Sequence, residues 1–178
     1  MREIGLKRGI VKLFEYQKGW VSLYKAEHQQ LKSALNDFVS DIQHIGSTSV
    51  PGLCAKPIID VMIGVKTLDN FVEYIDILKR IGYEFREYAS EPDRKFFLKR
   101  NNDIRTHHLH IVEIDTEEWS KHIIFRDYLI DHKDTSGEYA CLKYELARKF
   151  PKDRNNYTAE KSKFIKMIVD QAKKRLYE

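Results

Sequence analysis

A single acidic residue interrupts one of the most apolar stretches of the sequence. Asp60 lies in residues 57–65, PIIDVMIGV, whose other members are apolar residues, one glycine and one proline. Burying a carboxylate in such surroundings is costly unless the group is paired, hydrogen-bonded or bound to a metal. Asp60 therefore either serves a ligand or forms a salt bridge with Lys56 or a histidine, and the cost of burial favours the functional interpretation.

A turn-rich segment precedes this apolar run. Residues 46–56, GSTSVPGLCAK, are rich in residues that favour turns. Gly46 can adopt backbone angles that other residues avoid, and consecutive N–H groups in such a turn can bind anionic oxygens. The hydroxyls of Ser47 and Thr48 would add donors, so we expect these three residues to hold phosphate groups, with Lys56 offsetting their charge. An ordinary turn capped by serine or threonine is the alternative.

Three histidines lie close together further along the chain. On a strand, His108 and His110 point to one face, whereas His107 and Glu113 point to the other. Two imidazoles on one face can bind a metal or a phosphate, or transfer a proton. The alternative for each is a half-buried strand residue whose hydrogen bonds are satisfied.

Other polar residues are weaker candidates. Arg126 lies on a predicted helix and could bind a phosphate or carboxylate through two parallel hydrogen bonds, or form a surface ion pair instead. His44 lies one predicted strand away from the other histidines. Arg94, Lys95 and Arg105 are strand-borne alternatives to Arg126.

The spacing of apolar residues predicts the elements that position these side chains. Helices are expected over residues 18–38 and 68–81 and near 117–132, 136–149 and 158–176. Strands are expected over residues 41–45, 57–65, 83–88, 95–99 and 106–114. This order favours an α+β fold, with helices packed on one side of a mixed β-sheet and a helical C-terminal part.

Length and composition indicate a globular protein. The 178 residues are 42% hydrophobic, so we expect a single domain over residues 1–178. No apolar run approaches the roughly 20 residues that span a bilayer, and no signal peptide is recognisable, so we expect a cytoplasmic protein without membrane contact. Cys54 and Cys141 lie far apart and outside any metal-binding motif, which predicts reduced thiols and no zinc site.

Positive charge is concentrated near the C-terminus. From residue 141 onward, eleven Lys and Arg residues face five Asp and Glu residues, a balance of +6, whereas the whole chain carries +4. Such a segment can meet phosphates or nucleic acid. Because acids interrupt the run, the solvated face of a surface helix is the favoured interpretation, and nucleic acid is an improbable partner.

One long block makes a family recognisable. Residues 44–65, HIGSTSVPGLCAKPIIDVMIGV, resemble the signature of the GrpB family. The resemblance begins near Trp20 and continues through HLHIVE at 108–113, FRDYL at 125–129 and KYELA at 143–147. It implies a fold of the nucleotidyltransferase superfamily. Domains of this kind are also found attached to dephospho-CoA kinase.

The superfamily pattern implies a Gly-Ser turn after one strand and a pair of acids on the next, which hold Mg²⁺ against nucleotide phosphates. Gly46 and Ser47 match the turn, and Asp60 matches the first acid. Met62 stands where the second acid is expected, and a thioether does not suit a hard cation.

The departure at Met62 leaves three ways for the site to work. Glu113 or the histidines at 107–110 could rebuild a site for Mg²⁺ or Mn²⁺, with Asp60, His110 and Glu113 as the ligands. The site could instead hold a softer metal, or it could bind a ligand without catalysing a reaction.

Three functions follow, from different classes. The first is an enzyme that transfers a nucleotidyl or phosphoryl group to a small acceptor with the help of a metal, with His108 or His110 as a ligand or base. The second is an inactive module that binds a nucleotide or a CoA precursor. The third, nucleic-acid binding through the C-terminal helices, ranks last because no nucleic-acid motif is present. The sequence leaves the oligomeric state open.

Overall fold

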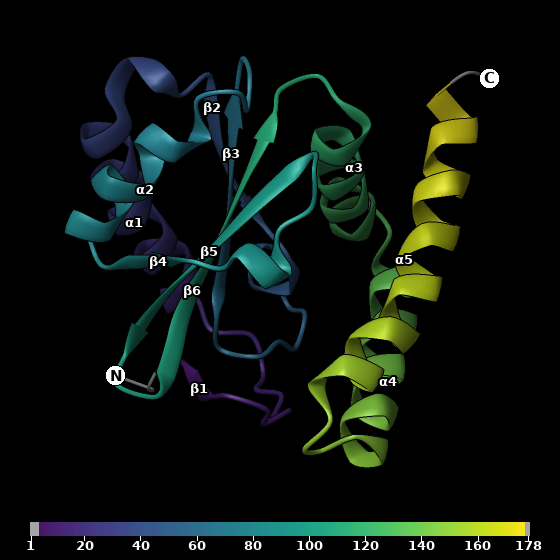
Figure 1. Cartoon of the computed structure of the whole chain (residues 1–178). Coiled ribbons are helices and arrows are strands. Elements are labelled where there is room, and N and C mark those ends of the chain that lie inside the picture. Colours follow the sequence, from purple (N-terminus) through teal and green to yellow (C-terminus); the bar gives the residue numbers. More distant parts are fainter. Residues whose placement is uncertain (1–3, 177–178) are drawn as a thin grey trace.

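A mixed β-sheet forms the centre of the molecule in the computed structural model, which describes residues 4–176. The strand order is β2-β3-β6-β5-β4, with β1 paired to β6, and every pair is antiparallel except β3 with β6 (Figure 1). The strands are β1 (Leu6–Lys7), β2 (Asp41–Ile45), β3 (Ile59–Val65), β4 (Tyr83–Phe85), β5 (Arg94–Asn101) and β6 (Ile104–Glu113).

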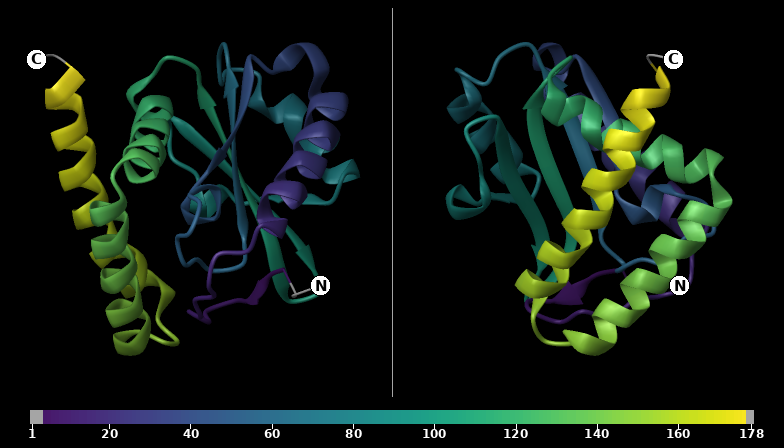
Figure 2. Two further views of the ribbon diagram at one scale, coloured as in Figure 1. Left: turned by 180° about the vertical axis from the view of Figure 1, so that it is seen from behind. Right: turned by 90° about the vertical axis from the view of Figure 1, so that its right-hand side faces the viewer.

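Helices cover both faces of this sheet. They are α1 (Gly19–Leu35), α2 (Phe71–Arg80), α3 (Glu117–Asp131), α4 (Lys133–Lys149) and α5 (Arg154–Leu176). Helices α1 and α2 lie on one side and α3, α4 and α5 on the other (Figures 1 and 2). None of the described helices is long and apolar enough to cross a membrane.

The two faces follow from the composition of β3. Val61 and Ile63 are fully buried in the large core with α1 and α2, whereas Met62 packs with Trp119 of α3 on the opposite face. A strand that is buried on both faces reads as a continuous apolar run instead of an alternating one. The α+β class with a mixed sheet is confirmed, but the expectation of helices on one side only is wrong.

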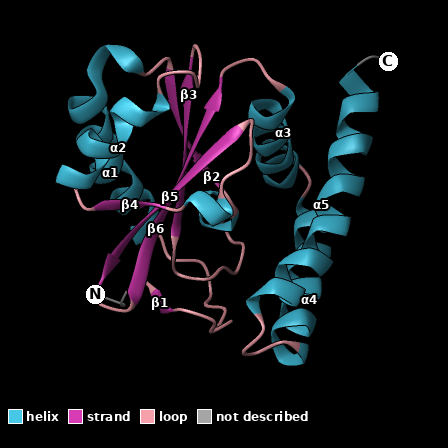
Figure 3. Ribbon diagram, in the orientation of Figure 1, coloured by secondary structure: helices cyan, strands magenta, loops and turns pink. Residues whose placement is uncertain are grey.

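The fold differs from the sequence-based prediction at the start of one helix and by one additional strand. Helix α5 begins at Arg154 instead of near residue 158, after Asp153 accepts hydrogen bonds from Asn156. The short strand β1, which the sequence analysis missed, pairs with β6 near the N-terminal end of the described chain (Figure 3). A 3-10 turn over Ser47–Ser49 follows Gly46 and connects β2 to the loop before β3.

Candidate functional site

The parallel pairing of β3 and β6 brings Asp60 and the histidines to one face of the sheet. Asp60 is the cross-strand partner of His108, and Met62 is the partner of His110. Partners on neighbouring strands point to the same face, and so do residues two apart on one strand. Asp60, His108 and His110 therefore share the face that α3 covers.

Asp60 and His108 form a direct pair. His108 Nδ1 lies 2.9 Å from Asp60 Oδ1, and the side chains are 7% and 27% exposed respectively. Burial alone would raise the pKa of Asp60, but the hydrogen bond from His108 and the neighbouring positive charges hold it below its usual range. Burial lowers the pKa of His108. An ionised carboxylate can only accept, so a neutral His108 donates from Nδ1 and fixes the orientation of Asp60.

The Gly46 turn lies against Asp60. Gly46 has a φ of +71°, and a Cβ placed on it would lie 2.5 Å from Asp60 Oδ2. Both observations demand glycine, because an L-residue strains at this φ and its side chain would collide with the carboxylate. The turn and the acid, recognised separately in the sequence, thus meet at one place.

The next two residues of the turn face different surroundings. Ser47 Oγ accepts a hydrogen bond of 3.1 Å from Lys143 Nζ on α4, and the same ammonium also donates to the carbonyl oxygen of Cys54. Thr48 is buried, and its hydroxyl lies 3.0 Å from His44 Nε2. The hydroxyl of Thr48 therefore meets a histidine within the protein, whereas that of Ser47 is held by α4.

Two of the histidine candidates lie on the far face. His44 stacks on Tyr24 with ring centroids 4.5 Å apart, and burial lowers its pKa to about 4. His107 lies 3.6 Å from Glu27, and burial likewise lowers its pKa to about 4. Both belong to the core side with α1, and among the described residues neither forms a hydrogen bond with Asp60.

His110 lies on the same face of the sheet as Asp60 and His108, two residues after His108 on β6. Its Nδ1 lies 3.3 Å from Arg94 Nη1, and its ring packs beside those of Phe96 and His122. Burial is the main reason why its pKa falls well below the ordinary value. It borders the Asp60–His108 pair, and among the described residues it forms no hydrogen bond with either.

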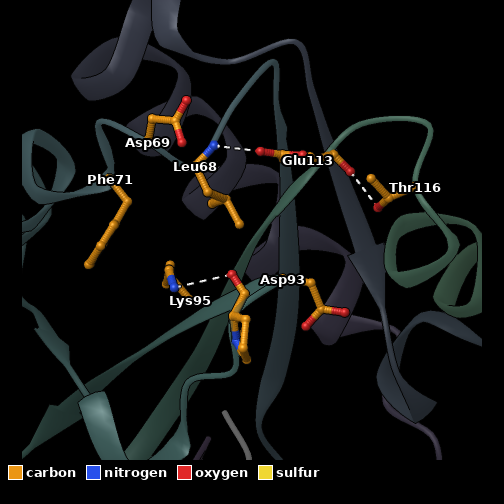
Figure 4. Close-up of a pocket in the computed structure, with 8 residues that line it drawn as sticks. Leu68, Asp69, Phe71, Asp93, Lys95, Glu113 and Thr116 are labelled. Carbon is orange, nitrogen blue, oxygen red and sulfur yellow. Dashed lines mark hydrogen bonds between the residues drawn. The ribbon is translucent and has the colours of Figure 1, made fainter.

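The structure does not bring Glu113 or Arg126 to Asp60. Glu113 Oε1 accepts the N–H of Leu68, and the side chain lines a depression with Asp93 and Lys95 on the opposite face (Figure 4). Arg126 donates to the side chain of Gln43 and to the carbonyl oxygen of His44, so it joins α3 to β2. Its guanidinium is thus engaged in holding the fold.

Lys56 lies at the edge of the site, together with basic residues that the sequence analysis did not single out. Its ammonium lies 5.4 Å from the ring centroid of Tyr157 on α5. Burial, followed by the charges of Lys161 and Arg154, lowers its pKa to about 7. The buried Lys143 was also missed. The sequence feature that could have identified the residues of α5 is the spacing of Arg154, Tyr157 and Lys161, which places them on one helix face.

The donor groups present do not fit the two-carboxylate metal site that the family resemblance implies. Met62 is fully buried and offers no oxygen, and one oxygen of Asp60 already accepts from His108. Within residues 4–176, no cluster of three or more His, Cys, Asp or Glu side chains is placed to hold a metal ion. The arrangement is that of one ionised, partly exposed carboxylate beside a glycine turn and a serine hydroxyl.

The comparisons with known proteins agree with the fold and with the resemblance. A family model described as GrpB protein matches residues 10–171. The glutamate-rich protein GrpB of Alkalihalophilus pseudofirmus is 36% identical over 172 residues, which cover 94% of this chain and 99% of that protein. The crystal structure of conserved protein GrpB from Enterococcus faecalis matches with a TM-score of 0.86 at 36% identity, and the match covers 94% of this chain and 100% of that chain.

More distant matches place the fold in a wider group. The Cid1 poly(U) polymerase bound to MgATP matches with a TM-score of 0.53 at 11% identity, over 75% of this chain and 44% of that chain, which shows likeness of fold alone. Dephospho-CoA kinase of Mycolicibacterium paratuberculosis is 24% identical over 185 residues, which cover 90% of this chain and 46% of that protein. The fold is nucleotidyltransferase-like, and the chain belongs to the GrpB family.

Proposed function

We propose that this protein binds a nucleotide or a related phosphorylated small molecule beside Asp60 and transfers a phosphoryl or nucleotidyl group from it to a small acceptor. The observation that carries the proposal is the position of an ionised, partly exposed Asp60 against the Gly46 turn. The nucleotidyltransferase-like fold supports it, and so does the distant match to a dephospho-CoA kinase. The first support is one of fold, and the second is a match over 46% of that protein, so the reaction and the substrate are left to experiment.

The residues would divide the work as follows. The backbone N–H groups after Gly46 and the hydroxyl of Ser47 would donate to phosphate oxygens. Asp60 would accept a hydrogen bond from the acceptor hydroxyl and align it with the phosphorus. In loose phosphoryl-transfer transition states, positioning and charge stabilisation supply most of the catalysis. A carboxylate with a low pKa is suited to that aligning role, and His108 would keep it in place.

Metal assistance was expected from the family resemblance, and the residues present supply only one of the two acids that it needs. The proposal therefore routes no step through a metal. Mg²⁺ and Mn²⁺ belong in the assay as added components, so that a requirement for either becomes visible as a loss of activity with a chelator.

The experiment is an assay of nucleoside diphosphate and pyrophosphate release from nucleoside triphosphates in the presence of a protein-free metabolite extract, because phosphoryl transfer leaves the diphosphate and nucleotidyl transfer leaves pyrophosphate. We expect release by the wild type and a loss of about 100-fold or more in Asp60→Asn, because the variant keeps the shape of the side chain but loses its charge. Melting temperatures of the two proteins serve as the folding control. Equal release by both proteins would refute the role of Asp60.

A binding module without catalysis is the second candidate, and the burial of Met62 at the second acid position favours it. In that case the wild type would bind the nucleotide saturably, in the presence of a chelator, and would release neither nucleoside diphosphate nor pyrophosphate. The same assay, run beside a binding titration, separates the two candidates.

A further inference from the structure

Four cations from three separate parts of the chain lie beside the Asp60 site, close enough for their charges to act on one another. Lys56 precedes β3, Arg105 lies on β6, and Arg154 and Lys161 lie on α5. We refer to these four residues as the basic cluster. None of them is fully exposed, and Arg105 is only 9% exposed. Cations on an ordinary solvated surface would lie open to water.

Helix α5 contributes one continuous face to the basic cluster. Arg154, Tyr157 and Lys161 are spaced by three and four residues, so they lie on the same side of the helix. Tyr157 is 1% exposed, and its ring contacts two ammonium groups, with Lys56 Nζ at 5.4 Å and Lys161 Nζ at 5.2 Å from the centroid. The two lysines therefore meet at one buried aromatic ring.

A β-bulge turns Arg105 toward the same side. Leu98 on β5 pairs with His108, and the pairing then shifts so that Arg100 pairs with Arg105. Leu98 and Arg100 are two residues apart and share a face, so Arg105 shares the face of His108. Without the shift, the odd-numbered Arg105 would point to the face of His107.

The basic cluster has no acidic partner of its own. Among residues 4–176, none of the four side chains forms an ion pair or a hydrogen bond, in contrast to Arg126 and Lys143. Asp60 is the carboxylate whose charge reaches Lys56, and it is already paired with His108. Burial, followed by the charge of Arg154, lowers the pKa of Arg105. Like charges held together in partial burial are unfavourable unless an anion joins them.

We propose that the basic cluster is a subsite for a chain of two or more phosphate groups, adjacent to the Gly46 turn. One phosphate monoester carries a charge of about −1.5 to −2 at neutral pH, so four cations exceed what a single phosphate can balance. Arginine and lysine side chains are the groups that recognise phosphate oxygens. The inference rests on the proposed function for the expectation that the ligand carries phosphates, and it adds that the ligand carries a polyphosphate.

The test is a calorimetric titration with inorganic pyrophosphate and tripolyphosphate in the absence of divalent metal. We expect both to bind the wild type, with a dissociation constant at least about tenfold lower than that of inorganic phosphate. Arg105→Gln and Lys161→Gln should each raise the dissociation constant for pyrophosphate by about tenfold or more. Lys166→Gln removes the same charge from an exposed position on α5 and should leave it within about twofold of the wild type.

A second readout is independent of the ligand. Without any anion, Lys161→Gln should melt at a higher temperature than the wild type, because it removes a like charge from beside Lys56. Lys166→Gln should melt as the wild type does. A lower melting temperature for Lys161→Gln would overturn the inference, and so would equal pyrophosphate affinity in Lys161→Gln and Lys166→Gln.

The titration also separates this inference from the proposed function. If pyrophosphate binding depends on the basic cluster but no nucleoside triphosphate is bound or turned over, the subsite stands and the proposed function fails. If Asp60-dependent release occurs while the basic-cluster variants bind pyrophosphate like the wild type, the proposed function stands and the subsite is refuted.

Discussion

Gly46 is the residue at which backbone conformation and site chemistry depend on each other most directly. Its φ of +71° and its approach to Asp60 Oδ2 leave no room for a Cβ. Gly52, in the same loop, has a φ of +83° but open space around the position of a Cβ. The two glycines therefore share the backbone requirement and differ in the steric one.

This pair provides a matched comparison. Gly52→Ala should lower the free energy of unfolding by roughly 1 kcal/mol through backbone strain alone. Gly46→Ala should cost at least about 1 kcal/mol more, because Asp60 must move, and it should also weaken nucleotide binding. Urea denaturation of both variants measures the difference. Equal losses of unfolding free energy in the two variants would contradict the close contact between Gly46 and Asp60.

At the scale of single residues, the sequence identified Asp60, Gly46 and Ser47, since an acid in an apolar strand and a glycine turn are both visible as departures from pattern. It also placed His108 and His110 on one face, which the pairing of β3 with β6 confirms. It could not see that Thr48 and His44 satisfy each other, because that contact depends on the 3-10 turn over Ser47–Ser49. The contact of Lys143 with Ser47 was equally invisible, since the two lie 96 positions apart.

At the scale of elements, α4 holds the turn after Gly46 through one buried side chain. Lys143 is 1% exposed and donates to Ser47 and to the carbonyl oxygen of Cys54. Burial is the main cause that lowers its pKa from 10.5 to about 7. Between about pH 7 and pH 10.5, this amine is protonated in the unfolded chain but not in the folded protein. The free energy of unfolding should therefore rise with pH in this range.

Lys143→Met tests this link between α4 and the turn. Its free energy of unfolding should rise less steeply than that of the wild type between about pH 7 and pH 9, with a difference of up to about 1.4 kcal/mol per pH unit. Urea denaturation at intervals across this range measures the two slopes, and Lys152→Met, at an exposed loop position, is the control. Identical slopes for wild type and Lys143→Met would show that the amine stays protonated in the folded protein.

The element boundaries explain why the basic cluster escaped the sequence analysis. A predicted helix from residue 158 excludes both Arg154 and Tyr157 from the face that carries Lys161, whereas α5 begins at Arg154. The run of positive charge then resembles a solvated helix face interrupted by acids. Arg105 was named as a strand-borne candidate, but its position on the face of His108 depends on the bulge, which cannot be read from composition.

At the scale of the whole molecule, the long apolar run of β3 and the 44–65 block were sufficient to predict the fold class. The covering of both faces was not predicted, although the continuous apolar run of β3 is the pattern of a strand that is buried on both sides. Asp60 lies on the sheet face that α3 covers, and Lys56, just before β3, lies 5.4 Å from the ring centroid of Tyr157 on α5. The proposed phosphate subsite would therefore join Arg154 and Lys161 of α5 to the site on the strands, without a separate nucleic-acid surface.

The most direct measurement is a thermal-shift titration of wild type and Asp60→Ala with nucleoside triphosphates and CoA precursors, with and without Mg²⁺ and Mn²⁺. A ligand present at a hundred times its dissociation constant stabilises the folded state by roughly 2.7 kcal/mol, which is readily visible as a shift. The account predicts that at least one of these ligands stabilises the wild type and that the shift is lost or much reduced in Asp60→Ala. A shift of equal size in both proteins, or no shift with any of the ligands, would contradict it.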